Sequence, residues 1–410
     1  MTKSKQLHQA SKSATKKFSN KPVGSSTQPC PAEDKQLLTV QWQPLTSYCG
    51  DRIAVKATAK GMPANTKANA QVKVDGKTVA TLEGTGMNSF NLPWEVKDVV
   101  FTGEAMPVKF SVQAMFVAGG QSKQTEKDLD ILRVPDKAPE PISFTRRSGR
   151  FGWTAAFRAG INKNQLTIQQ TIQIKKAWLG KWVEFDNTLD GRSGWSWVKK
   201  VGTDWKFWDT SVTPNAWSPL PRGISDYTVN NVVFVQKGSE FVSRDNDSFK
   251  WPEAFSEPSN YAQKKNDWLS NIHQVWDNKF ELLRKNCQSS DKNCCKWRIR
   301  VEVKWDDNAG DKLVYAIAAQ DWERSNAKDW YLSEHRLGVA GHECGHLLGA
   351  YDEYTGGAID TATNIIDNDS IMGQNLTKGH PRHLDGLRDQ VKSKINGWIG
   401  RSWDFEVKNI

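Results

Sequence analysis

The chain has no apolar run that approaches the ~20 residues needed for a membrane-spanning helix, which excludes such a span. Its N-terminus also lacks the apolar core of a secretory signal. We therefore expect synthesis in the cytoplasm without a signal peptide. The protein then either stays inside the cell or leaves by a leaderless route.

The six cysteines form no C-x-x-C pair, which argues against a structural zinc ribbon. Cys287 and either Cys294 or Cys295 are spaced to close a short loop, and such a disulfide would fit an oxidising compartment. The alternative is free thiols in a cytosolic protein. Cys344 is expected to face the core as a small apolar residue.

Acidic residues are missing from the first part of the chain. Up to Cys30 it carries six lysines, no acids and one aromatic residue, Phe18. Such a Ser- and Gln-rich stretch cannot bury a core, so we predict that residues 1–35 form a disordered basic tail. Because it lacks stacking platforms, we expect an arm or export handle and no nucleic-acid partner.

Short runs with a period of two follow the tail and predict a β-sandwich over residues 36–135. Arg52–Thr58, Ala70–Val74 and Phe110–Val117 alternate in this way, and Asp75-Gly76 is a hairpin signal. Strands at this spacing favour an immunoglobulin-like fold.

A Pro-rich linker over residues 136–142 is expected to separate the sandwich from a second domain over residues 143–410. Within that domain, residues 176–255 form a Trp-rich β segment, beginning after a strand at Gln165–Ile174. We interpret its aromatics as core and turn packing. A groove for carbohydrate or peptide is the alternative.

The last third alternates helical and strand patterns. Apolar residues at helical spacing predict a long helix over residues 260–285. Trp297–Trp305 and Lys312–Ala318 are predicted strands that pair with each other. A helix from Asp329 or Ser333 to Leu348 should follow.

That last helix carries the most informative motif, H-E-x-x-H-x-x-G-x-x-D. His342 and His346 lie four residues apart and can reach one metal ion from the same helix face. Gly349 favours a helix stop that brings Asp352 back as a third ligand. Glu343 is left to act as the general base on a metal-bound water. Three protein ligands plus water is the pattern of a catalytic zinc site.

This motif, with Ser370-Ile371-Met372-Gly373 downstream, resembles the metzincin peptidases, in which a Met-containing turn follows the long zinc motif. Most of these families use His as third ligand, whereas Asp352 is similar to the third ligand of snapalysin-like secreted peptidases. The resemblance is close over residues 335–385. It implies that the second domain is an α+β, metzincin-like zincin.

Astacins and serralysins place a Tyr two residues after the Met, where this chain has Gln374. Tyr354 or His383 could replace that phenol in steadying the oxyanion, and we assign the role to His383. A fourth zinc ligand from His380 or His383 would close the site and oppose hydrolysis.

Asp367, Asn368 and Asp369 could bind Ca²⁺ between the helix and the Met-containing turn. Their spacing does not match a calcium loop, which favours a solvated turn.

We therefore predict a zinc metalloendopeptidase with one catalytic Zn²⁺ ion and a peptide or protein substrate. A β-sandwich ahead of a peptidase without a signal peptide resembles toxins delivered by bacterial contact-dependent machines, the type VI secretion system among them. That resemblance implies a secretion-machine carrier, an immunity protein, and action outside the producer or in a target cell's periplasm. The alternatives are a catalytically silent, zinc-stabilised binding module and a zinc hydrolase acting on a cell-wall polymer.

Overall fold

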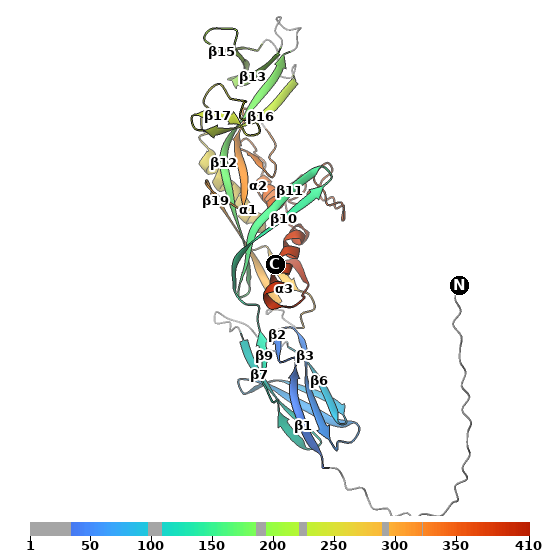
Figure 1. Ribbon diagram of the computed structural model, residues 1–410. Helices are drawn as coiled ribbons and strands as arrows, with labels where there is room; N and C mark the ends of the chain where they lie inside the picture. Colours follow the sequence, from blue (N-terminus) through green and yellow to red (C-terminus); the bar gives the residue numbers. More distant parts are fainter. Residues whose placement is uncertain (1–33, 97–108, 186–193, 221–227, 289–294, 322) are drawn as a thin grey trace, which may run out of the picture.

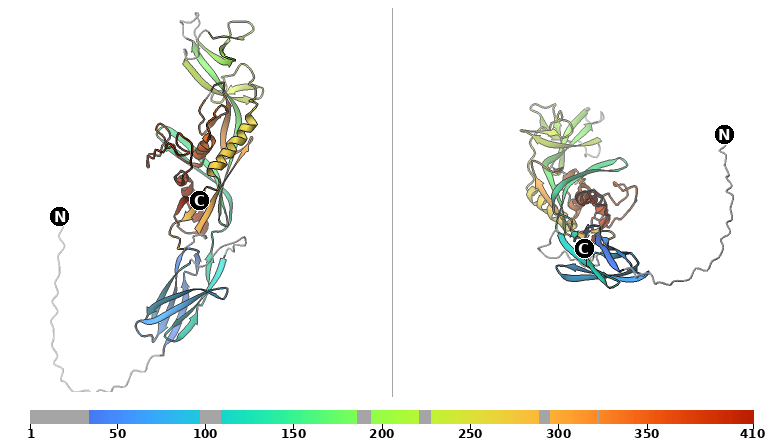
Figure 2. Two further views of the ribbon diagram at one scale, coloured as in Figure 1. Left: turned by 180° about the vertical axis from the view of Figure 1, so that it is seen from behind. Right: turned by 60° about the horizontal axis from the view of Figure 1, so that its bottom comes forward.

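The computed structural model describes residues 34–96, 109–185, 194–220, 228–288, 295–321 and 323–410. This part of the chain is mostly β-structure with three α-helices. The molecule is elongated: the N-terminal strands form one end, the helices lie in the middle and residues 194–220 and 228–243 form the other end (Figures 1 and 2). Most of the predicted tail, with Cys30, lies outside the described residues.

Two sheets enclose one hydrophobic cluster in the N-terminal part. Their strands are β1 (Gln36–Gln43), β2 (Thr46–Tyr48), β3 (Arg52–Lys60), β4 (Thr66–Val74), β5 (Lys77–Gly86), β6 (Ser89–Glu95), β7 (Lys109–Ala118), β8 (Gln121–Gln124) and β9 (Leu129–Leu132). One sheet has the order β1-β3-β6, and the other β2-β9-β7-β4-β5 with β8 beside β7. Every second residue along β3 is buried, so the period-two pattern correctly marked its inner face.

Glycine turns connect these strands as expected. Asp75 and Gly76 join β4 to β5 with positive φ angles of 50° and 76°, and Val74 pairs directly with Lys77. Two positive φ values are the requirement of a type I′ hairpin, which explains the Asp-Gly sequence.

One branched sheet forms the frame of the remaining chain. Its strands are β10 (Lys137–Ser148), β11 (Phe151–Asn162), β12 (Gln165–Phe185), β13 (Gly194–Val201), β14 (Asp204–Asp209), β15 (Ala216–Pro219), β16 (Thr228–Lys237), β17 (Glu240–Ser243), β18 (Phe280–Arg284), β19 (Lys296–Asp306), β20 (Lys312–Ala318), β21 (Asp329–Tyr331) and β22 (Phe405–Asn409). The long strand β12 pairs with β11, β13, β16, β19 and β20 in turn.

The helices are α1 (Tyr261–Trp276), α2 (Val339–Leu348) and α3 (Asp385–Ile399), with a short 3-10 helix, η3 (Pro381–Leu384), before α3. A single hydrophobic cluster joins all three α-helices to the sheet. Within the described residues, no helix combines the length and apolar character needed to cross a bilayer.

The segment expected to be a linker is a strand. Residues 137–142 begin β10, which pairs only with β11 among the described strands, and prolines are tolerated on such an edge strand. The register shifts between Lys137 and Glu140, opposite Gly160. A Cβ at Gly160 would lie 2.6 Å from the Lys137 carbonyl oxygen, so the bulge requires glycine there. The prolines therefore mark a bulged edge strand.

The long helix expected over residues 260–285 also differs. Helix α1 ends at Trp276, and Asn278 turns the chain with a φ of 54°. Strand β18 then runs between β19 and β22. Phe280 and Leu283 keep helical spacing with Trp276, so periodicity alone could not separate the helix from a short buried strand.

Strands β19 and β20 form where they were predicted, but they do not pair with each other. Each instead pairs in parallel with β12, so β12 is the shared neighbour that the sequence did not reveal.

The aromatic side chains of the Trp-rich segment pack mainly against one another. Trp178, Trp197 and Trp251 are buried in one cluster with Phe234 and Phe241. This confirms the packing interpretation for these residues.

A compact junction fixes the N-terminal sheets to the rest of the chain. Arg284 of β18 donates to the Cys49 carbonyl oxygen at 3.1 Å, pairs with the Asp51 carboxylate, and lies 3.8 Å from the Trp403 ring centroid. Tyr48 contacts the same ring edge-on at 5.2 Å.

A disulfide adjoins this junction. It joins Cys287 to Cys295, one of the two pairings that the sequence allowed, and lies against Gly50. Cys49 is also disulfide-bonded. The Cys287–Cys295 disulfide therefore lies at a contact surface that is held by an ion pair and by ring contacts.

We predict that Arg284→Ala lowers the free energy of unfolding by about 3–5 kcal/mol, because it leaves a largely buried carboxylate without its partner. The loss is measured as the change in the free energy of the first transition in urea-induced unfolding. Lys237→Ala is the matched control, since the Lys237–Asp247 pair is exposed, is screened by solvent and should contribute little to stability. Equal effects of the two changes would contradict the prediction.

Candidate metal centre

Helix α2 is short and buried along its whole length. It begins at Val339, later than expected, because residues 329–331 form β21 and Gly338 adopts a φ of 92°. Glycines let its neighbours approach closely: a Cβ at Gly341 would lie 2.8 Å from a Val275 methyl group. Gly349 ends the helix with a φ of 99°, as the motif predicted.

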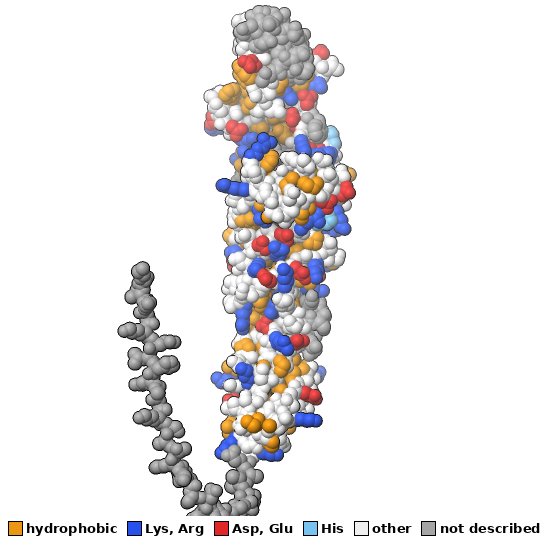
Figure 3. All heavy atoms as spheres, turned by 90° about the vertical axis from the view of Figure 1, so that its right-hand side faces the viewer, with side chains coloured by type: hydrophobic (Ala, Val, Ile, Leu, Met, Phe, Trp, Pro, Cys, Tyr) orange, Lys and Arg blue, Asp and Glu red, His pale blue; other side chains and the backbone are white. Residues whose placement is uncertain are grey.

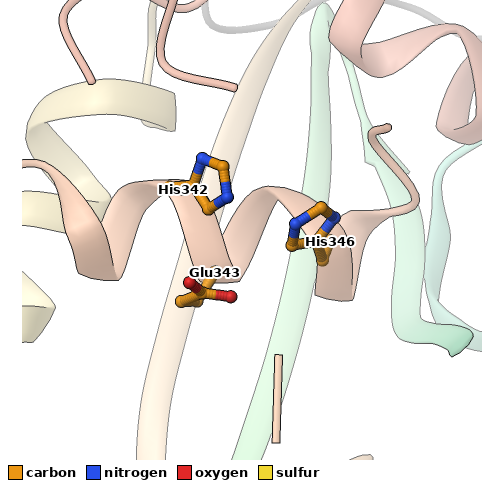
Figure 4. A group of neighbouring side chains, drawn as sticks. All are labelled: His342, Glu343 and His346. Atoms are coloured by element: carbon orange, nitrogen blue, oxygen red, sulfur yellow. The ribbon is translucent and has the colours of Figure 1, made fainter. Parts of the chain in front are cut away.

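Helix α2 carries both histidines of the motif, and their rings lie with centroids 4.9 Å apart (Figure 4). His342 Nδ1 is 2.9 Å from the Ile371 carbonyl oxygen, and His346 Nδ1 is 3.0 Å from that of Ala350. Because a carbonyl only accepts, each Nδ1 carries the proton when its ring is neutral. Both Nε2 lone pairs then point away from these contacts and are available to a metal ion.

Asp352 completes the group. Its Oδ1 lies 3.2 Å from His342 Nε2 and 3.3 Å from His346 Nε2, while its Oδ2 accepts from the Ala358 amide at 2.6 Å. Oδ1 is buried and, with both rings neutral, has no hydrogen-bond donor. Three acceptor atoms that converge without a donor form a site suited to a cation.

The electrostatics also favour positive charge there. Burial alone would lower the pKa of His346, but the hydrogen bond and charge of Asp352, with the charge of Glu343, raise it to about 9. Burial would raise the pKa of Asp352, yet the two imidazoles hold it well below its usual range. The carboxylates therefore attract either a proton or a metal ion to this position.

Glu343 follows His342 on α2 and is buried. A ligand atom from each of Glu343, His342 and His346 lies within 4.8 Å of the others, so these side chains form a group that can hold a metal ion. Burial raises the pKa of the Glu343 carboxyl, while the imidazoles act in the opposite direction. A carboxyl whose pKa is raised by burial is suited to accepting and returning a proton.

The group opens into a cleft of about 1040 Å³. One wall is the start of β11, where Trp153 donates from its indole nitrogen to the His346 carbonyl oxygen at 2.9 Å. The other wall is the start of β20 with residues 324–328, and residues 352–358 close one side. No local pattern in the sequence marks Trp153 or Arg324, because β11 and residues 324–328 meet α2 only through the tertiary fold.

A turn forms at Ser370–Gly373 beneath α2. The Gly373 amide donates to the Ser370 carbonyl oxygen at 3.0 Å, and the buried Met372 packs against Gly345. The turn also supplies the Ile371 carbonyl that orients His342. Met372 therefore packs against the helix that carries the two histidines.

His383 lies elsewhere than its assigned role requires. It is buried in η3, its Nδ1 accepts from the His380 amide at 3.0 Å, and its Nε2 is 3.1 Å from Glu353 Oε2. Neither His380 nor His383 lines the cleft. Nearness to Met372 in sequence did not reveal which side of the turn His383 would occupy.

Tyr354, the other candidate from the sequence, does line the cleft. Its ring centroid is 6.3 Å from that of His342. Burial, assisted by the Asp352 charge, raises the pKa of the phenol to about 12, so it remains a hydrogen-bond donor at neutral pH. The geometry thus favours Tyr354 over His383 as the group that faces a bound substrate.

The acids suggested for Ca²⁺ are engaged with protein partners. Asp367 pairs with Arg382 at 2.6 Å, and Asp369 accepts from the Asn375 amide at 2.6 Å. Arg382 also pairs with Glu353 at 2.7 Å, so this network braces the loop behind the cleft.

Comparison of the chain with protein-family models gives no match, and comparison with curated proteins gives none either. The case for a metal centre therefore depends on the geometry of α2 and Asp352.

We predict that Asp352→Ala lowers metal affinity by more than about a hundredfold, because even outer-shell substitutions commonly cost 10–100-fold. Metal content after equilibration in a competing chelator measures the change. Asp360→Asn is the control, since its carboxylate bonds only within the same loop. Unchanged metal content in Asp352→Ala would show that the third ligand lies elsewhere.

Proposed function

We propose that this protein is a zinc-dependent endopeptidase with an immunoglobulin-like domain ahead of a metzincin-like catalytic domain. The observation that carries the proposal is the convergence of three atoms in the cleft beside Glu343. They are the Nε2 atoms of His342 and His346 and Asp352 Oδ1, which is buried and has no hydrogen-bond donor. Two nitrogens and one oxygen are a common donor set for catalytic zinc.

The three ligands in the proposal are His342, His346 and Asp352, which leave a coordination position open toward the cleft. When bound, the metal ion would supply a Lewis acid that activates water and polarises a carbonyl group. Glu343 would accept the proton from the attacking water and return it to the leaving amine. The Tyr354 hydroxyl would donate to the developing oxyanion.

The wall of the cleft supports a peptide as substrate. Strand β11 pairs with β10 over its whole length, but its second edge pairs with β12 only from Arg158 onward. Over Phe151–Phe157 that edge pairs with no described strand, and its first residues line the cleft. Within the described residues, only side chains bond to it there: the Thr154 carbonyl oxygen accepts from Lys312 and that of Ala156 from Gln170. An extended peptide can add to such an edge through main-chain hydrogen bonds. β21, the strand before α2, has only three residues and is less suited.

Export to an oxidising compartment remains part of the proposal. The Cys287–Cys295 disulfide supports it, because disulfides persist mainly in such places. Delivery as a toxin by a type VI-like machine, with a carrier and an immunity protein, rests on the resemblance of the domain arrangement alone.

We predict that Glu343→Gln abolishes peptide hydrolysis while about one zinc ion stays bound, because the carboxylate is assigned as base and not as ligand. Cleavage of a peptide library and metal analysis of the same sample measure both properties. Glu240→Gln, an exposed glutamate of β17, is the control. A wild-type protein that binds zinc but cleaves no peptide would instead favour the silent binding module or the cell-wall hydrolase.

We predict that Tyr354→Phe reduces kcat by roughly 10²–10³-fold, the usual effect of removing one oxyanion donor. Zinc content should not change. Tyr351→Phe is the matched control, because Tyr351 packs against Trp153 and Arg146 outside the cleft lining. A wild-type rate in Tyr354→Phe would exclude the phenol from the reaction.

A further inference from the structure

The charged side chains that line the cleft are unevenly distributed. The acids are Glu343 and Asp352, and both belong to the candidate metal centre. Apart from the imidazoles, the other charged lining residues are all cations: Lys312, Arg324 and Lys328. None of them forms an ion pair with a carboxylate in the described part of the chain. On an outer face, by contrast, positive and negative side chains are interspersed (Figure 3).

All three cations stand on the same wall. Lys312 opens β20, and the amide of Tyr315 in that strand donates to the Lys328 carbonyl oxygen at 2.8 Å. This bond holds residues 324–328 beside β20. The facing wall, residues 151–154, is Phe-Gly-Trp-Thr and carries no charge. The cleft therefore has one uncharged wall, whose strand edge pairs with no described strand, and one basic wall, and Lys312 bridges the two at the Thr154 carbonyl oxygen.

Arg324 is the cation placed next to the candidate catalytic groups. Its guanidinium carbon lies 5.0 Å from the Tyr354 ring centroid, and its charge acts on Glu343. The next residue, Ser325, is buried and accepts from the Tyr331 amide at 3.0 Å. The backbone beside Arg324 is thus anchored, which keeps the exposed guanidinium at the cleft.

Lys312 lies deeper in the wall. Its Nζ donates to the Thr154 carbonyl oxygen at 2.5 Å, and burial lowers the pKa of the ammonium group. A partly desolvated cation with only a neutral acceptor gains stability when an anion approaches.

We propose that the cleft selects substrates with a carboxylate close to the cleaved bond, and that Arg324 is the residue that determines this specificity. Lys312 and Lys328 extend the same basic wall. The inference rests on the proposed peptidase function. A peptide held by its main chain along β11 leaves the opposite wall to recognise its charge. The carboxylate is either an Asp or Glu side chain or the α-carboxylate at the end of the substrate chain.

The first test is cleavage of a proteome-derived peptide library, with the cleaved bonds read by mass spectrometry. We expect Asp and Glu to be enriched at a fixed position beside the cleaved bond. Matched peptides with Glu or Gln at that position should then differ in kcat/KM by about tenfold or more, as expected for a charge-assisted hydrogen bond. If cleavage instead follows a fixed distance from the C-terminus and is lost on amidation, the α-carboxylate is the group recognised.

The second test reverses the charge. Arg324→Glu should lose the preference for Glu over Gln and favour Lys at the same position. Lys56→Glu, an exposed change on β3 in the N-terminal sheets, is the matched control and should keep the wild-type preference. Lys328→Glu is a second cleft variant in case Arg324→Glu fails to fold, and it should reduce the ratio. A wild-type ratio near one, or a ratio unchanged in both cleft variants, would overturn the proposal.

Binding separates this proposal from the proposed function. The Glu and Gln peptides are titrated into Glu343→Gln, which cannot turn them over, and fluorescence anisotropy gives their Kd values. Tighter binding of the Glu peptide without any cleavage by the wild-type protein supports the charge selectivity while contradicting the peptidase. Cleavage by the wild type with equal Kd and kcat/KM values for both peptides contradicts only the selectivity.

Discussion

The orientation of two imidazole rings by backbone carbonyls is the constraint on which the site depends. The Ile371 and Ala350 carbonyl oxygens fix the protons of His342 and His346 on Nδ1, so both Nε2 atoms face Asp352 Oδ1. Without these carbonyls the rings could rotate or change tautomer, and the three acceptors would not converge. Each carbonyl belongs to a different loop, so the site requires the whole region around α2 to be folded.

Close packing around α2 explains how those loops are held. Gly341 and Gly345 bring α1 and Met372 against the helix, and Trp276 donates to the Gly341 carbonyl oxygen at 2.8 Å. Behind the cleft, Arg382 bridges Glu353 and Asp367 and braces the loop that carries Asp352. The acceptors are therefore preorganised by tertiary contacts and do not depend on the helix alone.

The sequence predicted the local part of this site. Two histidines four residues apart, a Gly stop and an Asp three residues later are fixed by helix geometry and by the φ that glycine allows. The Asp75-Gly76 turn was predictable for the same reason. Each of these features depends on residues that lie close together in the sequence.

What the sequence could not predict depends on contacts between distant segments. Arg324 and Trp153 reach the cleft through the pairing of β20 and β11 around β12, which no local pattern encodes. His383 follows Met372 closely in sequence, yet η3 turns its ring toward Glu353. Strand β10 was mistaken for a linker because of its prolines. An edge strand tolerates proline, and proline content alone does not distinguish such a strand from a linker.

X-ray absorption spectroscopy of the zinc-loaded protein tests the central claim most directly, because it identifies the atoms around the metal. The account predicts a four-coordinate ion with two imidazole nitrogens and oxygen donors at about 2.0–2.1 Å. Absence of imidazole scattering, or a sulfur neighbour at about 2.3 Å, would contradict the assignment of His342, His346 and Asp352 as the ligands.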